Sequence, residues 1–189
     1  VDDMRTFRPT FILAVPRVFE KIYAGAEEKA AAAGKGRLFN TAAATAIAYS
    51  EALDSAARGG TGPSLALRLR HAAFDRLLYP KVRAAFGGDL DIAISGASPL
   101  SPQLAHFFRG SGIAVLEGYG LTETTAPASV NTLPLTRVGT VGLPMPGNAI
   151  RIADDGEVLV SGVGVFTGYH RNPEATAEAF SDGWFHTGD

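Results

Sequence analysis

Residues 90–125 read LDIAISGASPLSPQLAHFFRGSGIAVLEGYGLTETT, and this stretch decides the class of fold. Short apolar runs at 90–94 and 113–116 predict two buried strands. Between them, Ser101 and Pro102 supply an N-cap and a first-turn residue, which predicts a helix through the intervening residues. A strand, a helix and a strand within about 25 residues indicate a βαβ unit in a parallel sheet.

The segment before this unit predicts one strand and three helices. Residues 10–15 form an apolar run that Pro16 ends, which indicates another buried strand. We expect a helix-rich insert over 16–86, where apolar residues recur at three- and four-residue spacing. The three stripes are Val18, Ile22 and Ala26; Leu38, Ala42, Tyr49 and Leu53; and Leu65, Leu69, Ala73 and Leu77. We interpret all three as core packing and not as cofactor binding.

The last third of the chain predicts mainly β structure. Ile150 and Ile152 face Val158 and Val160 across an Asp-Asp-Gly turn, which is typical of a hairpin. A short helix is expected at 172–180, where an Asn-Pro pair opens it. No helical pattern longer than this one is found in this part of the sequence.

These elements together indicate an α/β protein in two portions. The first, residues 1–133, holds the insert at 16–86 and the βαβ unit, which with its following loop covers 90–123. The second, residues 134–189, is expected to form a small, distorted, β-barrel-like subdomain. The chain begins with Val and stops just after an aromatic Trp-Phe pair. Natural termini are usually polar, so we expect a piece of a longer polypeptide.

Composition argues against several classes of function. The 189 residues include 17 basic and 19 acidic side chains, and the net charge of -2 argues against a nucleic-acid partner. The longest apolar run near the start covers only residues 11–15, far short of the roughly 20 residues that a membrane helix needs. The chain has no cysteine, which excludes disulfides and thiolate sites and is compatible with a reducing, cytoplasmic location.

The residues after the second strand of the unit carry groups suited to a nucleotide. Residues 117–125 (EGYGLTETT) are expected to form a loop at the carboxyl end of that strand, where open α/β sheets bind ligands. Tyr119 offers a flat face for a base, and Thr122 offers a hydroxyl for a phosphate oxygen. Glu123 supplies a hard carboxylate oxygen of the kind that Mg²⁺ takes alongside substrate phosphates. The two glycines would let the backbone approach a ligand, although a plain glycine turn is the competing interpretation.

Three other motifs were weighed. The small residues 95–100 (SGASPL) should lie beside that loop and leave room for a planar ring or a thin acyl group. Ser98 invites a serine-hydrolase interpretation, but Leu100 stands where Gly-x-Ser-x-Gly needs its last glycine, which disfavours it. Residues 162–168 superficially resemble a dinucleotide fingerprint, yet their spacing favours a structural turn. The four histidines lack zinc-ligand spacing, so no zinc site is expected. Packing roles are expected instead.

Four stretches in order resemble the adenylate-forming synthetases, and within them the long-chain fatty acyl-CoA synthetases. Residues 15–22 (VPRVFEKI) are similar to a segment typical of the long-chain branch. Residues 95–100 resemble the small-residue loop that borders both adenine and acyl chain. Residues 117–123 match Tyr-Gly-x-Thr-Glu, and 158–176 with 182–189 resemble the motif pair that closes the large N-terminal domain. The resemblance covers essentially the whole chain and implies part of that domain.

The resemblance implies a nucleotide site built from three parts of the chain. The residues it would place against the nucleotide are Gly96, Ala97, Ser98, Glu117, Gly118, Tyr119, Gly120, Thr122 and Asp189. Tyr119 would flank the adenine, and Asp189 would accept hydrogen bonds from both ribose hydroxyls. Thr122 would bind the α-phosphate and Glu123 would hold Mg²⁺, so these two are the expected catalytic residues. The small-residue loop would form the wall between adenine and the acyl carboxylate.

The implied activity is a two-step ligation of a long-chain fatty acid to CoA. Attack of the carboxylate on the α-phosphorus of ATP gives an acyl-adenylate and pyrophosphate, and the CoA thiolate then takes the acyl group. Two anions meet in the first step, so cations must offset their repulsion. The family's phosphate loop and its mobile domain with a catalytic lysine are not found in these 189 residues. Alone, they are therefore expected to turn nothing over.

Two further readings of the function stay open. One is another adenylate-former, such as an aryl-CoA ligase, a fatty acyl-AMP ligase or a peptide-synthetase adenylation domain, because the sequence does not place the pocket that selects the acid. The other is a non-catalytic acyl- or nucleotide-binding module that keeps the fold. Long acyl substrates are compatible with a peripheral membrane encounter, although no anchor is encoded. Chain-length preference and oligomeric state are not indicated.

Overall fold

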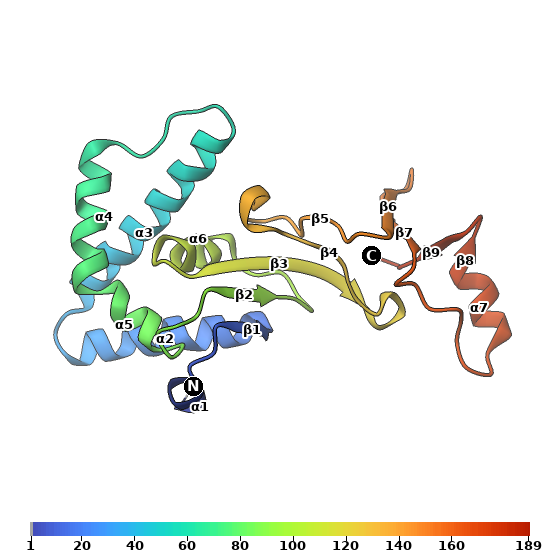
Figure 1. Cartoon of the computed structure of the whole chain (residues 1–189), viewed down its shortest axis with the longest axis horizontal. Helices are drawn as coiled ribbons and strands as arrows, with labels where there is room; N and C mark the ends of the chain where they lie inside the picture. The colour runs from blue at the N-terminus through green and yellow to red at the C-terminus, as the bar shows by residue number, and fades with distance from the viewer. Residues whose placement is uncertain (1) are drawn as a thin grey trace.

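Five strands form the first of two sheets in the computed structural model, which describes residues 2–189 (Figure 1). In spatial order they are β1 (Phe11–Ala14), β2 (Ile92–Ser95), β3 (Ala114–Leu121), β4 (Ala126–Val130) and β5 (Leu143–Pro144). The first three run parallel, whereas β4 and β5 pair antiparallel. The sheet is therefore mixed, and its parallel part is the part that the sequence predicts.

The predicted βαβ unit is confirmed. Helix α6 (Pro102–Gly110) carries the chain from β2 to β3, and the register places Ser95 opposite Glu117 at the carboxyl ends of the two strands. Ser101 occupies the N-cap position of α6, but its hydroxyl makes no capping hydrogen bond. The helix start thus depends on the proline in its first turn, whose fixed φ suits that position.

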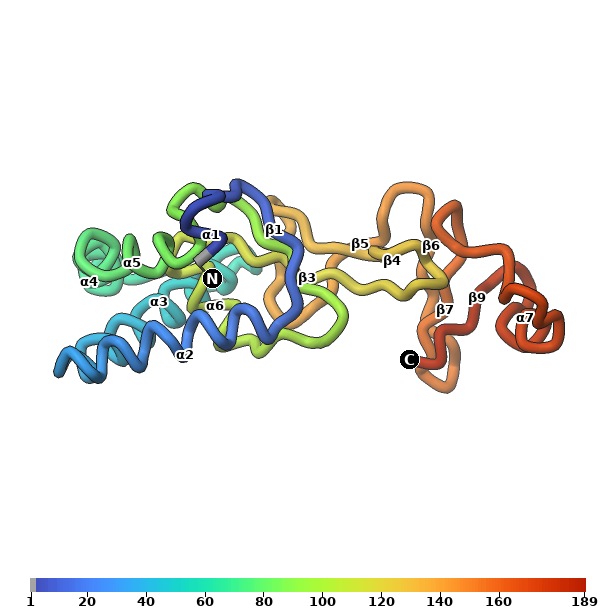
Figure 2. The backbone as a smooth tube through the Cα atoms, turned by 90° about the horizontal axis from the view of Figure 1, so that it is seen from below, coloured from blue at the N-terminus to red at the C-terminus, as the bar shows by residue number. Residues whose placement is uncertain are grey.

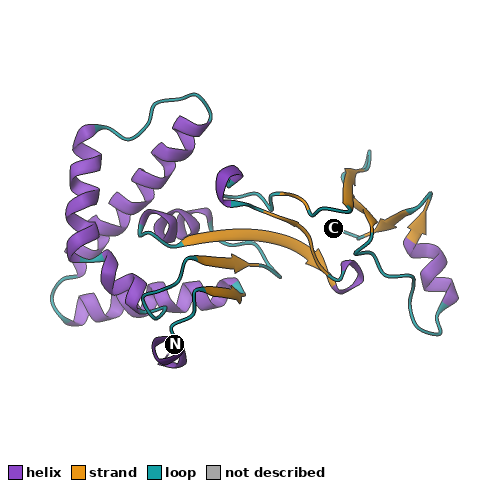
Figure 3. Cartoon of the chain, in the orientation of Figure 1, coloured by secondary structure: helices purple, strands orange, loops and turns teal. Residues whose placement is uncertain are grey.

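Most helices gather at one end of an elongated molecule (Figures 2 and 3). They are α1 (Asp2–Phe7), α2 (Pro16–Ala32), α3 (Gly36–Ala57), α4 (Leu65–Leu77) and α5 (Tyr79–Ala84), with short 3-10 turns η1 (Thr122–Thr124) and η2 (Leu133–Leu135) further on. Within residues 2–189, no helix combines the length and the apolar character that crossing a bilayer requires.

The core lies between these helices and one face of the sheet. Its centre is a group of buried phenylalanines, in which Phe19 and Phe86 each meet Phe108 edge to face at ring-centroid distances of 5.6 Å. Such tilted contacts suit the quadrupoles of aromatic rings and add to the free energy of burial. Ala93 of β2 and Val115 of β3 supply the floor of the core from the sheet. The βαβ unit is thereby fixed against the helices.

The strand expected at residues 10–15 is confirmed as β1, but the expected burial holds for one face only. The side chains of Phe11 and Leu13 are 54% and 70% exposed, while Ile12 and Ala14 pack against the core. Successive side chains of a strand point to opposite faces. The helices within the described residues cover one face of β1 and leave the other uncovered.

The predicted stripe of α4 is also wrong as a core face. Leu65, Leu69 and Leu77 are all more than 60% exposed, whereas Phe74 is buried. Helix α4 contacts its neighbours through its aromatic side, where His71 stacks on Tyr49 of α3 at a centroid distance of 3.8 Å. Aromatic rings therefore decide which face of this helix is buried, and the leucine spacing does not.

The stripe of α3 is confirmed only in part. Ala42 is buried as expected, but Leu38 and Leu53 are 48% and 37% exposed. The face that packs on α6 is instead built from Phe39 and small residues such as Ala46. Small side chains permit a close helix–helix approach, which the two leucines would prevent.

The second sheet confirms the predicted hairpin and the predicted short helix. The sheet has the order β6 (Asn148–Ile152), β7 (Val158–Gly162), β9 (Trp184–His186) and β8 (Phe180–Ser181), and α7 (Pro173–Ala179) precedes β8. Ile150 pairs with Val160 and Ile152 with Val158, as the alternation predicts. The side chain of Asn172 caps α7 by accepting a hydrogen bond from the Ala175 N–H.

The β-rich portion is an open antiparallel sheet, so the expected barrel-like form is corrected. Four strands with two unpaired ends do not close into a barrel within the described residues. The chain passes from the first sheet to the second between residues 144 and 148, because β5 still pairs with β4 and β6 begins the second sheet. The division expected at 133/134 stays a prediction about domains.

Candidate functional site

The first half of the expected loop at 117–125 is a strand. β3 continues to its end at residue 121 and pairs with β4. A Cβ on Gly118 would meet the Ser129 carbonyl oxygen at 3.2 Å, and a Cβ on Gly120 would collide with the backbone of Ala126. These glycines therefore let β4 approach closely, and this packing explains them better than the ligand approach we expected.

The second half of that stretch is a tight turn. η1 is closed by the buried Thr124 hydroxyl, which donates to the carbonyl of Ala126 at 3.0 Å. Thr125 and Ala126 both adopt positive φ, 56° and 67°, a region that residues with a Cβ rarely occupy. Backbone strain of this kind persists where the surroundings fix it, and it concentrates at functional sites. The strained turn presents Thr122, which is exposed, and the neighbouring Glu123, which is half-buried.

The side chain and the backbone of Glu123 are both held by the segment that follows β7. Tyr169 donates its hydroxyl proton to Glu123 Oε1 at 3.1 Å, and the Phe166 N–H donates to the Glu123 carbonyl at 2.8 Å. Partial desolvation and the hydrogen bond to Glu123 raise the pKa of Tyr169. The Thr125 hydroxyl also donates to the Gly164 carbonyl at 2.7 Å. The interpretation of residues 162–168 as a structural turn is confirmed, and the turn supports Glu123.

The small-residue loop lies beside β3, as expected. The Gly96 N–H donates to the Ala14 carbonyl of β1 at 3.2 Å, and a Cβ on Gly96 would lie 3.6 Å from the Gly118 carbonyl oxygen. Ala97 has a φ of 70°, so this loop also holds a non-glycine residue in the left-handed region. Ser98 is exposed. The carboxyl ends of β1 and β2 thus meet β3 at one edge.

The carboxylate of Glu117 faces the interior. It is 9% exposed, and its two oxygens accept the N–H groups of Leu100 at 3.3 Å and Gly139 at 3.1 Å. Two backbone donors satisfy a buried carboxylate that would otherwise be costly. Glu117 therefore ties the small-residue loop to the segment after η2, and its carboxylate is engaged within the protein.

Asp189 reaches the site from the far end of the sequence. The Tyr119 hydroxyl donates to Asp189 Oδ2 at 2.6 Å, although 70 positions separate the two residues. Burial, followed by the hydrogen bond to Asp189, raises the pKa of Tyr119 to about 12. The C-terminal residue is thereby brought to the second half of β3, which carries Tyr119, as the position of the C-terminus in Figure 1 agrees. The structure brings together the three regions that the sequence predicts, while their ligand roles stay predictions.

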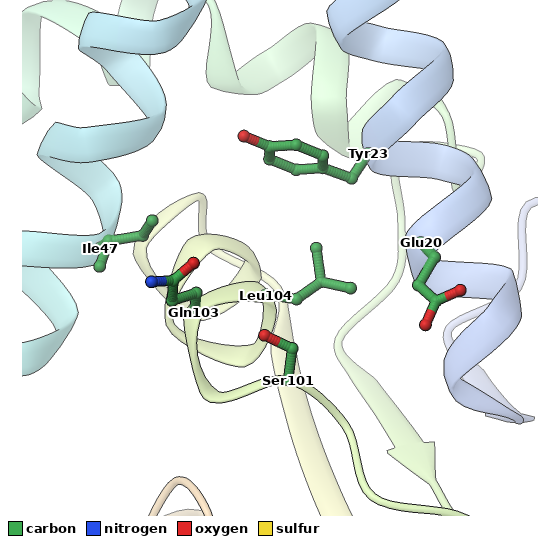
Figure 4. A pocket seen from close by; sticks show the side chains of 6 residues that line it. All are labelled: Glu20, Tyr23, Ile47, Ser101, Gln103 and Leu104. Carbon is green, nitrogen blue, oxygen red and sulfur yellow. The ribbon is translucent and has the colours of Figure 1, made fainter.

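Two cavities lie near these elements. One is lined by Asp155, Gly156, Glu157, Gly188 and Asp189, and so borders the predicted ribose-binding carboxylate. The other, of about 260 Å³, lies between α2, α3 and the start of α6, as Figure 4 shows. Its lining residues are Glu20, Tyr23, Ile47, Ser101, Gln103 and Leu104. None of the predicted site residues lines this second cavity.

The donor set fits one kind of metal binding. Among residues 2–189, no three His, Asp or Glu side chains come together to hold an ion. Mg²⁺ is commonly held by one or two carboxylates and completes its shell with substrate phosphates and water. The single carboxylate of Glu123, on an exposed turn beside Thr122, fits this arrangement and not a metal cage made by protein alone.

His71 and His106 contact Gly110 and Ser50, respectively, which are packing roles.

Comparison with known families agrees with this geometry. The family model described as "AMP-binding enzyme" matches residues 1–170. The chain therefore belongs to the AMP-binding enzyme family, and the predicted adenylate-forming resemblance is confirmed.

The relatives point to one branch. The chain is 55% identical over 186 residues to the long-chain-fatty-acid–CoA ligase FadD15 of Mycobacterium bovis, covering 98% of this chain and 30% of that protein. It is 35% identical over 208 residues to long chain acyl-CoA synthetase 2 of Arabidopsis thaliana, covering 100% of this chain and 30% of that protein. The chain thus spans about a third of the length of these curated relatives.

Solved structures share the fold. The N-terminal domain of FACL13 from Mycobacterium tuberculosis has a TM-score of 0.50 at 27% identity, covering 59% of this chain and 33% of that one. A malonyl-CoA ligase in a product complex with methylmalonyl-CoA and AMP has a TM-score of 0.50 at 33% identity, covering 65% and 28%. These neighbours confirm the predicted α/β class.

Two residues of the site escaped the sequence analysis. Tyr169 follows the glycine-rich turn, and Glu157 follows the Asp-Asp-Gly turn, so both were passed over as neighbours of structural turns. Their partners lie 46 and 29 positions away in sequence. An aromatic residue or a carboxylate directly after a conformationally restricted turn was the only local signal.

Proposed function

We propose that the protein containing this chain is a long-chain fatty acid–CoA ligase, which activates its acid through an acyl-adenylate. The observation that carries the proposal is the contact of Tyr119 with Asp189 beside the turn of Thr122 and Glu123. The proposal takes the Tyr119 ring, the Thr122 hydroxyl and the carboxylates of Glu123 and Asp189 as the parts of one nucleotide site. The names of the 55% and 35% identical relatives support the choice of substrate.

Each residue of the proposed site has its own contact with one part of the nucleotide. Tyr119 would flank the adenine, and the carboxylate of Asp189 would accept hydrogen bonds from the ribose hydroxyls. Thr122 would donate its hydroxyl proton to an oxygen of the α-phosphate. Gly96 and Ala97 would separate adenine from the acyl carboxylate.

Glu123 is the residue proposed to hold Mg²⁺. When bound, the ion offsets the negative charge that builds up as the carboxylate approaches the α-phosphate. Tyr169 keeps the carboxylate of Glu123 oriented through its hydroxyl. The partners in this proposal are a fatty acid, ATP and CoA, and the proposed setting is the cytoplasm with peripheral contact to membranes that hold the acid.

Pyrophosphate release by the complete gene product, measured with carboxylic acids of graded chain length, tests this function. We expect the highest kcat/KM with long-chain acids. Glu123→Ala should lower the rate by one or more orders of magnitude and change its Mg²⁺ dependence, with the far-UV circular dichroism unchanged. Glu178→Ala, at an exposed position on α7, is the matched control and should keep the parental rate.

The contrary outcomes are distinct. A preference for short dicarboxylic acids would favour a ligase like the malonyl-CoA ligase neighbour. Equal Mg²⁺ dependence in Glu123→Ala and parent would remove the metal role of Glu123. No pyrophosphate release with any acid would leave a non-catalytic binding module.

A further inference from the structure

Glu157 is the first residue after the Asp-Asp-Gly turn, and both of its carboxylate oxygens hold the end of the chain. The Gly188 N–H donates to Oε1 at 2.9 Å, and His186 Nδ1 lies 2.7 Å from Oε2. Because a carboxylate offers only acceptors, Nδ1 must carry the proton in this contact. The Glu157 side chain is 21% exposed and that of His186 is 35% exposed, so the contact is only partly shielded from water.

Glu157 holds His186, the last residue of β9, and Gly188, which lies beyond that strand. The backbone of Asp189 is also tied to β7, because the Val158 N–H donates to the Asp189 carbonyl at 3.0 Å. A second set of bonds lies on the far side of this segment. The Thr187 hydroxyl donates to the Val158 carbonyl at 2.7 Å, and the Asp189 N–H donates to the Thr187 hydroxyl oxygen at 3.2 Å. Among these contacts of residues 186–189, Glu157 is the residue that holds the segment through a side-chain carboxylate.

The charge of Glu157 suits this role. The Gly188 N–H, and then the hydrogen bond from His186, lower the pKa of Glu157. The side chain is therefore ionised at neutral pH, and charge-assisted hydrogen bonds are about twice as strong as neutral ones. The same carboxylate borders the cavity that ends at Asp189.

We propose that Glu157 is a positioning residue, which fixes the backbone at Gly188 so that the Asp189 carboxylate stands ready for the ribose hydroxyls of the nucleotide. In this proposal Glu157 acts through Asp189 and needs no contact of its own with the ribose. The inference rests on the proposed function, because it takes the nucleotide site as given. It adds a residue that the family resemblance in the sequence did not supply.

The experiment uses the complete gene product with Glu157→Ala and Glu157→Gln. We expect Glu157→Ala to raise the Kd of AMP and the KM of ATP about tenfold, while the KM of the fatty acid and the melting temperature change little. Glu157→Gln keeps one acceptor oxygen, so its affinity for AMP and ATP should fall less than that of Glu157→Ala. Asp154→Asn, at an exposed carboxylate on the same turn, is the matched control and should match the parent.

A double-mutant cycle with the ligand separates positioning from a general loss of structure. Replacing AMP by its 2′,3′-dideoxy analogue removes the hydroxyls that Asp189 would hold. We expect a large loss of affinity in the parent and a much smaller further loss in Glu157→Ala, because the two changes act on one contact. Losses that add fully would overturn the role of Glu157.

The failures can be told apart. A parent that binds AMP but releases no pyrophosphate refutes the ligase proposal, and the cycle still tests Glu157. A parent that does not bind AMP overturns both proposals. If Glu157→Ala unfolds, Glu157→Gln carries the cycle, and full additivity in that variant likewise refutes positioning.

Discussion

Tyr119 combines two functions in one side chain. Its hydroxyl donates to the carboxylate of Asp189, three residues beyond the end of β9, while its ring is carried by β3. The hydroxyl therefore helps to position Asp189, whereas the ring offers a surface on which a base can stack. Substitutions at this one position can separate the two contributions.

The prediction at Tyr119 concerns nucleotide affinity. Tyr119→Ala should weaken AMP binding by about 1–3 kcal/mol, the usual worth of a base stacked on an aromatic ring. Tyr119→Phe keeps the ring and should lose clearly less. Calorimetric titration with AMP and, separately, with fatty acid measures both. If fatty acid suffers more than AMP, Tyr119 does not belong to the adenine site.

At the scale of elements, the contact between α3 and α6 holds the βαβ unit against the helices. Gly110, at the end of α6, lies directly against the backbone of Ala46, so a side chain has no room there. Arg109 forms an ion pair with the buried Asp54 of α3 in the same interface. The interface therefore combines a close backbone approach with a paired charge.

Gly110→Ala should destabilise the fold, because its methyl group would overlap the Ala46 carbonyl. Overpacking of this kind costs about 1–3 kcal/mol. Gly25→Ala on α2 is the matched control, since a Cβ there meets nothing within 4 Å and alanine favours the helix by about 0.5–1 kcal/mol. Urea unfolding of the complete gene product measures both. A neutral Gly110→Ala would contradict the close packing.

The same interface predicts a pH dependence. Burial lowers the pKa of His106, whose Nδ1 lies 2.9 Å from the Ser50 hydroxyl, although the nearby Asp54 opposes the shift. The unfolded chain then binds the proton more readily than the folded one. The free energy of unfolding should therefore fall as the pH drops through and below the unfolded value of 6.5.

His106→Gln should flatten this dependence between about pH 7 and pH 5, since it removes the titrating ring. His170→Gln, at an exposed position, should leave the slope of the parent unchanged. Urea titrations at stepped pH values give both slopes. A parental slope in His106→Gln would assign the dependence to another group.

At the scale of the whole molecule, local patterns predicted the elements whose cause is local. The alternation of Ile150 and Ile152 was sufficient for the hairpin, and Asn172 with its proline for the short helix. The βαβ unit followed from the spacing of its apolar runs in the same way. The hairpin and the short helix are fixed by neighbours within a few residues, and the strands of the βαβ unit pair across 22 positions along one short connection.

The features that the sequence did not predict depend on distant partners. Gly118 and Gly120 read as a loop because glycine is depleted in strands, and only the approach of β4 explains them. The leucines of α4 gave the wrong face because rings on a neighbouring helix decide its packing. Glu157 was missed because the groups it holds come 29 and more positions later.

The contacts of Tyr119 with Asp189 and of Glu123 with Tyr169 start from positions only four residues apart in the sequence. Both contacts join the end of β3 and its turn to segments that follow β7, so a shift of those segments would affect both contacts together. Under the proposed roles, a substitution that removes either contact is therefore expected to weaken nucleotide binding at both the ribose and the phosphates.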